Sequence, residues 1–471
     1  MNSFSEDCQI VCRNSDGLEL HASMAKLTRF AVVFEVYGPG SGLRVSEVLK
    51  EFQIILRKRV IYSGRATIRS LVATDQVEVC EASLSESFWL DLELTAAQSM
   101  NGALRKEFDG FIQDWQKLYN IVPEYKIIIA DMQSFFMDLR LWLNQVELVV
   151  RAAPEAEQAE TEERVTRELV APILPCIDVL FEKFETIALS LDENIREAHR
   201  SYMRRQLHPL VLCAPFAHRT FEKPLGYAGD YEMVNMIVRD LYEGKSLFAK
   251  VLNTWFLRQM PAEAHRNRIK YLRDRLIQET ARAARGGRPA KILNLGCGPA
   301  FEIQRFLQEC PISDNAQFTL LDFNDETLQY TQGRLSTMVR NHSRRTEVQL
   351  QKKSVLQVLK EYARPRGEQP KYDMVYCAGL FDYLADPACK HLMNIFYDMT
   401  LPGGLVLATN VEPSNPMRNG MEHLLDWNLI YRNGAQFRTL RPQKAEDENV
   451  EVYGDVTGVN VILEVRKSAH A

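Results

Sequence analysis

Two glycines and an aspartate have the types and spacing expected of a nucleoside site. Gly296 and Gly298 directly follow a short apolar run at residues 292–295, and a glycine accepts positive φ and lets a ligand approach the backbone closely. A second apolar run, residues 318–321, ends at Asp322, and the interval from Gly298 is 322 − 298 = 24 residues. An acid at about this spacing accepts hydrogen bonds from ribose hydroxyls in nucleotide-binding βαβ units.

The elements that must hold these residues are a strand, a loop and a helix. Apolar residues at 301, 303, 306 and 307 recur at helical spacing after the glycines, which predicts a helix. Its first N–H groups and positive dipole end then face whatever lies over the loop. Ala300 replaces the third glycine of the dinucleotide fingerprint, and the absence of a pyrophosphate-type GxGxxG argues against NAD or FAD.

Four sequence blocks carry a resemblance to a known family. LNLGCGPAFE and LLDFND resemble the first two motifs of class I S-adenosylmethionine-dependent methyltransferases, and YDMVYCAGLFDYL and LPGGLVLATN resemble the later strand motifs. The resemblance covers roughly residues 285–471. It implies an α/β, Rossmann-like domain with a seven-stranded sheet and a C-terminal antiparallel hairpin, and S-adenosyl-L-methionine as cofactor. The alternative is a Rossmann domain for another nucleotide-sized ligand.

The same resemblance implies a set of donor-binding residues. Asn294 stands where the family often has an acid, so Glu302 is expected to reach the methionine amino group. Ser354 stands where an acid often bonds the adenine amino group. The cofactor-binding residues expected are Tyr227, Asn294, Gly296, Cys297, Gly298, Glu302, Asp322, Phe323, Ser354, Val355, Ala378 and Gly379.

The acceptor side is less constrained. A carboxylate acceptor needs no base because it is already ionised, whereas an amine or phenol makes a base useful. His423, Trp427, Ile430 and Tyr431 have helical spacing, which predicts a helix. His423 is open to two interpretations, a pocket residue or a helix cap. Candidate catalytic residues are Asp382, Tyr383, His423 and Asp230, and candidate substrate-binding residues are His265, Arg268, Asn410, Trp427 and Tyr431. No group of residues has metal-ligand spacing, so we expect no metal.

Length and composition predict a soluble protein of two or three domains. The chain has 471 residues, of which 46% are hydrophobic and 25% charged. A net charge of −5 gives no reason to expect a nucleic acid polymer as partner. Nine cysteines without a framework, and no signal peptide, favour the reducing cytoplasm. No apolar run approaches the ~20 residues of a membrane helix.

Residues 1–95 have the texture of a small all-β module. We expect a frayed terminus over the first twenty residues, short strands from residue 31 onward including one at 88–92, and a short helix at 43–52. The module weakly resembles PilZ domains of bacteria, whose RxxxR arm binds cyclic di-GMP, and Arg65 and Arg69 have that spacing. The alternative is a structural module whose arginines are surface charges.

Residues 96–285 are predicted to be helical. Residues 96–200, with aromatic stripes at 108–119 and 135–142, are expected to form a bundle or a homodimer interface. Residues 201–285 are expected to form a helical lid or substrate region before the catalytic part, 286–471. Within it, KPLGYAGDYE is either a lid over the site or a turn in which Asp230 caps a helix. Arg266 and Arg268 are two apart, so at most one of them points into a site.

KPLGYAGDYE together with the methyltransferase motifs is similar to bacterial extracellular factor biosynthesis proteins, which make 3-hydroxypalmitic acid methyl ester. That resemblance implies a small-molecule acceptor, the carboxylate of a 3-hydroxy fatty acid, with Arg266, Arg268 or Arg432 near it and a long apolar tunnel. One alternative is methyl transfer to a different small molecule or a protein. The other is a non-catalytic sensor of a cyclic dinucleotide or partner, with a vestigial donor site.

Overall fold

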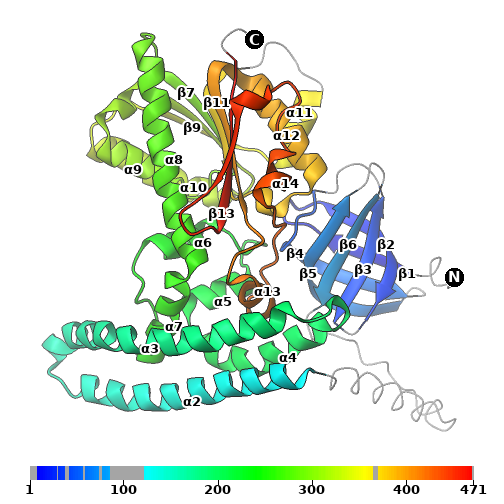
Figure 1. The fold of residues 1–471 in the computed structure, drawn as a ribbon, viewed down its shortest axis with the longest axis vertical. Coiled ribbons are helices and arrows are strands. Elements are labelled where there is room, and N and C mark those ends of the chain that lie inside the picture. The colour runs from blue at the N-terminus through cyan, green and yellow to red at the C-terminus, as the bar shows by residue number, and fades with distance from the viewer. Residues whose placement is uncertain are drawn as a thin grey trace.

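The computed structural model describes residues 8–28, 30–37, 42–56, 59–73, 77–84, 121–363 and 370–468. The chain begins with a closed β-barrel, continues through a long helical region, and ends in a seven-stranded sheet with helices on both faces (Figure 1). The barrel lies beside the C-terminal sheet and its helices, and the hairpin of α2 (Pro123–Arg151) and α3 (Gln158–Leu189) runs beneath both (Figure 1). No helix of the described residues is long and apolar enough to cross a membrane.

Six antiparallel strands close the barrel, so that it leaves no unpaired edge. Its core includes the fully buried side chains of Ile10, Phe34, Phe52, Ile54 and Ile68. The expected small all-β module is therefore confirmed. The strands, in the order β1-β2-β3-β6-β5-β4, are β1 (Cys8–Arg13), β2 (Glu19–Leu27), β3 (Ala31–Tyr37), β4 (Val48–Leu56), β5 (Arg59–Ala73) and β6 (Val77–Leu84).

Two predictions for the barrel are wrong. The first twenty residues are not frayed from residue 8 onward, because β1 buries Ile10 and Cys12 in the barrel core. Residues 43–52 form a turn and the start of β4, not a helix, and Ser46 (φ 64°) and Glu51 (φ 53°) have left-handed conformations that a right-handed helix excludes. The strand predicted at 88–92 and the aromatic stripe at 108–119 lie outside the described residues.

The helical region packs around one large apolar core. Tyr125, Phe136, Phe181, Phe184 and Trp255 are almost fully buried within it. Long helices with one apolar face pack in this way because each must bury that face against another element. The helices are α2 (Pro123–Arg151), α3 (Gln158–Leu189), α4 (Glu193–Val211), α5 (Pro215–Glu222), α6 (Tyr231–Val238), α7 (Leu247–Arg258) and α8 (Met260–Arg285).

The C-terminal sheet has the predicted architecture. Strands β7 to β11 are parallel, and β13 pairs antiparallel with both β11 and β12, which is the expected C-terminal hairpin. The strands, in the order β12-β13-β11-β10-β7-β8-β9, are β7 (Ala290–Leu295), β8 (Ala316–Asp322), β9 (Glu347–Lys352), β10 (Tyr372–Ala378), β11 (Thr400–Val411), β12 (Val450–Gly454) and β13 (Asn460–Arg466). The helices are α9 (Phe301–Glu309), α10 (Asp325–Asn341), α11 (Val355–Ala363), α12 (Asp386–Met399), α13 (Arg418–Leu424) and α14 (Gly434–Arg438).

The chain order reverses at β7, which has β8 on one side and β10 on the other. In open α/β sheets this switch point is where ligands bind, outside the carboxyl ends of the strands. The glycine loop predicted to bind the nucleoside follows β7 directly. The fold therefore places the predicted site at the position that sheet topology favours.

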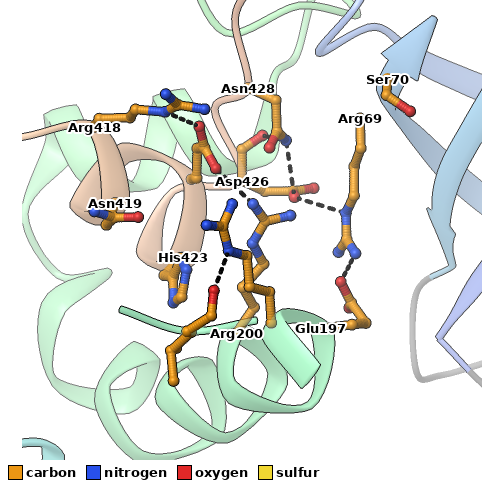
Figure 2. A network of polar contacts seen from close by, with 12 residues as sticks. Arg69, Ser70, Glu197, Arg200, Arg418, Asn419, His423, Asp426 and Asn428 are labelled. Carbon is orange, nitrogen blue, oxygen red and sulfur yellow. Dashed lines mark hydrogen bonds and ion pairs between the residues drawn. The ribbon is translucent and has the colours of Figure 1, made fainter. Parts of the chain in front are cut away.

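The barrel, the helical region and the C-terminal sheet domain meet at the carboxylate of Asp426, which Figure 2 shows. Asp426 follows α13 in a left-handed conformation (φ 51°). Its carboxylate pairs with Arg69 of β5 at 3.6 Å, Arg204 of α4 at 2.9 Å and Lys223 at 3.7 Å. These cations hold the pKa of Asp426 well below its usual range although burial opposes them.

This arrangement also gives the RxxxR arginines protein partners. Arg65 donates to the carboxylate of Glu222 at 3.0 Å and to the backbone carbonyl of the same residue at 2.6 Å. Arg69 is buried and pairs with Glu197 as well as Asp426 (Figure 2). In this structure, the two arginines therefore join the barrel to the rest of the chain.

Candidate active site

A cavity opens at the carboxyl ends of β7, β8 and β10. It contains about 1450 Å³ of space, open solvent at its mouth included, and it is lined by the barrel, the segment before α6, α8 and the loops of the sheet. All residues predicted to bind the donor line it: Tyr227, Asn294, Gly296, Cys297, Gly298, Glu302, Asp322, Phe323, Ser354, Val355, Ala378 and Gly379. Of the other candidates, Asp382, Tyr383, His265, Arg268 and Trp427 also line it.

The glycine loop has the backbone conformation that its sequence predicts. Gly296 (φ 72°) and Gly298 (φ 50°) are left-handed, and a Cβ built on Gly298 meets no atom of the described residues within 4 Å. The amides of Gly296 and Cys297 donate to the carbonyl of Leu321 at 2.8 and 3.1 Å, which ties the loop to β8. The loop thus leaves open space over its backbone, as a ligand in close contact with it requires.

Asp322 lies at the end of β8 within reach of this loop. Its carboxylate accepts from the amide of Gly298 at 3.2 Å and from that of Asn324 at 3.1 Å. Burial raises the pKa of Asp322, while those amides and the guanidinium of Arg44 act in the opposite direction. A carboxylate so fixed has lone pairs left to accept from two vicinal hydroxyls.

Glu302 and Asn294 form an acceptor pair on the other side of the loop. Glu302 Oε1 accepts from the hydroxyl of Tyr376 at 2.7 Å and from Asn294 Nδ2 at 3.3 Å. Asn294 Oδ1 is buried and has no hydrogen-bond partner among the described residues. An unpaired buried acceptor is costly, and an ammonium group placed here would satisfy it. This pair therefore fits the methionine amino group of the predicted cofactor.

The KPLGYAGDYE segment covers the donor side of the cavity. The ring of Tyr227 packs on Phe323 with 5.4 Å between centroids. Gly229 lies so close to Tyr383 that an added Cβ would be 2.5 Å from its hydroxyl. Asp230 does not line the cavity: it caps α6 by accepting from the amide of Met233 at 2.9 Å and pairs with Arg219 at 2.8 Å. The segment is therefore a cover over the site, and its aspartate has a structural contact.

Arg268 and His265 lie on one face of α8 in the cavity. Arg268 Nη2 donates to His265 Nδ1 at 2.9 Å, so the ring proton of His265 is on Nε2. Burial, and then the neighbouring arginines, lower the pKa of His265 well below its usual value, which keeps the ring neutral. Burial also lowers the pKa of Arg268, whereas Asp382 and Glu302 raise it. Arg266 points elsewhere, to Glu263 and the carbonyls of Ile237 and Leu257.

Asp382 and Tyr383 follow β10 and face the same space. Asp382 Oδ1 accepts from the amide of Val411 at 2.7 Å, and burial raises the pKa of this carboxyl to about 6 against the opposing charge of Arg268. The hydroxyl of Tyr383 accepts from Trp427 Nε1 at 3.0 Å, and burial raises its pKa too. The carboxylate is thus set to titrate close to neutrality.

The structure does not bring His423, Asn410 or Tyr431 into the cavity. His423 contacts the hydroxyl of Tyr125 at 2.9 Å, Asn410 donates to the carbonyl of Ile430 at 2.8 Å, and the ring of Tyr431 lies under the guanidinium of Arg418 at 4.3 Å. The helical spacing predicted for residues 423–431 is wrong, since α13 ends at residue 424 and Asp426 is left-handed. Arg432 is likewise bonded elsewhere, to Asp386, Asn410 and backbone carbonyls.

Sequence reasoning missed the residues that the barrel and the last hairpin contribute. Arg44 and Val45 come from the turn before β4, Val459 directly precedes β13, and Asn460 is the first residue of β13. Arg44 places its guanidinium carbon 4.3 Å from the ring centroid of Phe323. The arginine spacing drew attention to Arg65 and Arg69 instead, and no local pattern in residues 42–47 indicates contact with a segment almost three hundred residues away.

A second, almost wholly apolar cavity lies in the helical region beside the first and contains about 470 Å³ of space, open solvent included. The two share the lining residues Pro261, His265, Met421 and Trp427. The remaining lining residues of the second cavity are Phe181, Phe216, Ile237, Phe256, Gln259, Ala262, Met417, Gly420 and Leu425. His265 therefore lies at the junction between the two cavities.

No family model and no curated protein matches this chain. Among solved structures, a protein from Bordetella parapertussis shares 18% identity over 54% of this chain and 87% of its own, with a TM-score of 0.41. Magnesium protoporphyrin IX methyltransferase from Synechocystis, with S-adenosylhomocysteine bound, shares 10% sequence identity over 57% of this chain and 99% of its own, with a TM-score of 0.34. N-methyltransferase NodS from Bradyrhizobium japonicum, with the same ligand, shares 13% sequence identity over 53% of this chain and 98% of its own, with a TM-score of 0.30. S-adenosyl-L-methionine as cofactor is consistent with these structures, although identities and scores this low carry no argument about the activity of this chain.

Proposed function

We propose that this protein transfers a methyl group from S-adenosyl-L-methionine to the carboxylate of an amphipathic acid, such as a 3-hydroxy fatty acid, and so forms a methyl ester. The observation that carries the proposal is the position of Arg268. It lines the donor cavity, and its half-buried guanidinium donates to the histidine that borders the apolar cavity.

The donor cavity fits the cofactor group by group. Asp322 offers a fixed carboxylate to the ribose hydroxyls, and Asn294 Oδ1 and Glu302 offer acceptors to an ammonium group. Between these two ends, the backbone of Gly298 is open to the ligand, because a Cβ added there would meet no atom of the described residues within 4 Å. The fit depends on hydrogen-bond acceptors at both ends of the glycine loop. A ligand that joins an amino acid to a nucleoside needs this arrangement, because its ammonium group binds at one end and its ribose hydroxyls at the other.

The acceptor side fits an acid with an alkyl chain. A guanidinium presents a planar fork that matches a carboxylate in two hydrogen bonds, and Arg268 has no acidic hydrogen-bond partner among the described residues. The apolar cavity beyond His265 offers an aromatic and aliphatic lining to a chain. His265 Nε2–H, being a donor, is placed to bond a hydroxyl or carboxylate oxygen at the junction.

The chemistry asks little of the protein beyond placement. When bound, the cofactor supplies an activated methyl group and carries its own leaving group. Arg268 would orient the acceptor carboxylate, which is already ionised and needs no base. Tyr227 and Phe323 cover the donor side, and Trp427 with Tyr383 closes the acceptor side, so that water is excluded and the reacting atoms are held in line.

Two alternatives remain as outcomes of the test. A methyltransferase for another small molecule or a protein would bind the donor and ignore fatty acids. A sensor with a vestigial site would bind no donor, and the open glycine loop and fixed Asp322 argue against that decay.

The test combines donor binding with product identification. Calorimetry with S-adenosylhomocysteine is expected to give a binding isotherm, and 3-hydroxy fatty acids incubated with isotopically labelled donor are expected to yield labelled methyl esters by mass spectrometry. Arg268→Gln should raise the KM for the acid at least about tenfold, while Arg285→Gln, an exposed position on the same helix, should not. Donor binding with labelled products other than methyl esters, or with none, would overturn the acceptor assignment.

A further inference from the structure

The barrel reaches the donor cavity through residues 42–47, which we term the 42–47 turn. Glu47, 1% exposed, holds this turn: its carboxylate accepts from the amide of Arg44 at 2.9 Å and from the amide and hydroxyl of Ser15 at 2.6 and 2.5 Å. Ser46 takes the left-handed conformation (φ 64°) that the tight path requires. The turn is thus fixed by the barrel itself.

The same turn is bonded to both sides of the site. The amide of Val45 donates to the carbonyl of Tyr383 at 3.3 Å, on the acceptor side. The amide of Val48, at the start of β4, donates to the carbonyl of Gly226 at 2.7 Å, in the covering segment. The hydroxyl of Ser46 accepts from the amide of Asn428 at 2.9 Å. Three separate parts of the site are therefore positioned against one turn of the barrel.

Arg44 is the residue of this turn that lines the cavity. Its side chain is 7% exposed, its Nη2 is 3.3 Å from Asp16, and its guanidinium lies over Phe323. Asp322 and Tyr227 are close enough for its charge to oppose the rise in both of their pKa values that burial causes. A guanidinium has five N–H donors in a plane, and one ion pair with Asp16 occupies only part of that capacity.

We infer that Arg44 is a donor-binding residue supplied by the barrel, which supports Phe323 against the adenosyl group and presents N–H donors to its ring nitrogens or ribose oxygens. The inference rests on the proposed function, because it takes the adenosyl group of S-adenosyl-L-methionine as the ligand beside Asp322. It makes the barrel a working part of the donor site. By linkage, donor binding then strengthens the contact between the barrel and the catalytic part to the same degree as that contact strengthens donor binding.

Calorimetry with S-adenosylhomocysteine on the full chain tests this. Arg44→Gln is expected to weaken binding at least about tenfold, and Arg44→Lys less, because lysine keeps the charge and loses the planar fork. The matched control is Arg13→Gln, on the same barrel, where the side chain is about half exposed and is not among the residues that line the cavity. This variant should bind within about twofold of the unaltered chain. An Arg44→Gln protein with unchanged affinity overturns the inference. If the unaltered chain itself binds no S-adenosylhomocysteine, the proposed function fails instead.

A second measurement needs no variant and decides the case if Arg44→Gln does not fold. Hydrogen exchange of the unaltered chain is compared with and without S-adenosylhomocysteine. Residues 42–48 of the barrel should exchange more slowly with the ligand bound, together with residues 296–302. Protection at residues 296–302 without any at residues 42–48 would overturn the inference while leaving donor binding in place.

Discussion

Arg268 Nη2 lies 2.9 Å from Nδ1 of His265, one turn earlier on α8, and this bond fixes both side chains at the junction of the two cavities. The arginine determines which ring nitrogen carries the proton, and the neutral ring in turn positions the guanidinium. The pair works as a unit because neither side chain can reorient without breaking the bond to the other. We expect substitutions at either residue to raise the KM for the methyl acceptor and to leave the affinity for the methyl donor unchanged.

His265→Ala should raise the KM for the acceptor about tenfold, because Arg268 loses its partner. His265→Asn should recover much of this, since the amide oxygen can accept from Arg268 in place of Nδ1. The pKa of His265 is held well below its usual value, so this ring should not titrate between pH 6 and 8. Any step in the pH profile of kcat/KM over that range should therefore be present in both variants as in the unaltered chain. Steady-state kinetics over that pH range check all three points, and loss of such a step in His265→Asn would show that the ring titrates.

Asp382 predicts a pH dependence of stability. Its folded pKa is raised to about 6 from 3.8, so its contribution to stability is fully present below the unfolded pKa and is lost as pH rises from about 4 through 6. The loss is ~3 kcal/mol for a shift of this size. Asp382→Asn should therefore gain stability relative to the unaltered chain between pH 4 and 7. Thermal unfolding at several pH values measures it, and a constant difference would contradict it.

Asp322→Asn should weaken S-adenosylhomocysteine binding by about 1–3 kcal/mol, because the amide nitrogen cannot accept from a hydroxyl or from the amide of Gly298. Asp325→Asn, an exposed position three residues later in the first turn of α10, is the matched control and should bind normally. Calorimetry provides both values. Equal affinities for the two variants would mean that the ribose is anchored elsewhere.

Asp426→Asn should destabilise the protein by about 3–5 kcal/mol, because it leaves Arg69, Arg204 and Lys223 without their shared counter-charge. The pKa of Asp426 is depressed, so its contribution is present above the unfolded pKa and is lost only as pH falls below the usual range of an aspartate. Asp192→Asn, an exposed position before α4, should change little. Urea unfolding at neutral pH compares the two, and a small effect at Asp426 would show that the cations find other partners.

Met417→Trp should shorten the alkyl chain that the enzyme accepts, because the larger ring fills part of the apolar cavity. Met260→Trp makes the same substitution at an exposed position of α8 and should leave the preference unchanged. Rates with hydroxy acids of increasing chain length measure the shift. An unaltered length profile in Met417→Trp would place the chain outside this cavity.

The catalytic sheet was predictable because its signals are local. The strand, glycine loop and helix around Gly296, and the acid at Asp322, follow one another along the chain, and each lines the cavity as predicted. Tyr227 was also predicted from a resemblance that joins its segment to the sheet. The acceptor side was predicted less well: His423 and Tyr431 were assigned by helical spacing, and the left-handed Asp426 ends that spacing.

Arg44 could not be predicted in this way. Its role depends on how the barrel packs against the loop at Phe323, and a tertiary contact across so many residues leaves no periodicity in the sequence. The turn that carries it was even assigned to the wrong element, since Val45, Val48, Leu49 and Phe52 recur at helical spacing. Ser46 is bonded to distant residues, its amide to the carbonyl of Ile68 and its hydroxyl to the amide of Asn428, and Glu51 lies where the register of β4 against β5 shifts, so neither positive φ follows from local preference.

Gly229 has only a hydrogen atom in place of a side chain, and this lets the covering segment lie directly against Tyr383. Even one methyl group there would collide with the hydroxyl of Tyr383 at 2.5 Å, and the tyrosine is itself held by Trp427. We expect an alanine at this position to push the covering segment outward, to separate Tyr227 from Phe323 and to let water enter the cavity between them. Exclusion of water from the cavity thus depends on the contact between Gly229, which has no side chain, and the bulky ring of Tyr383.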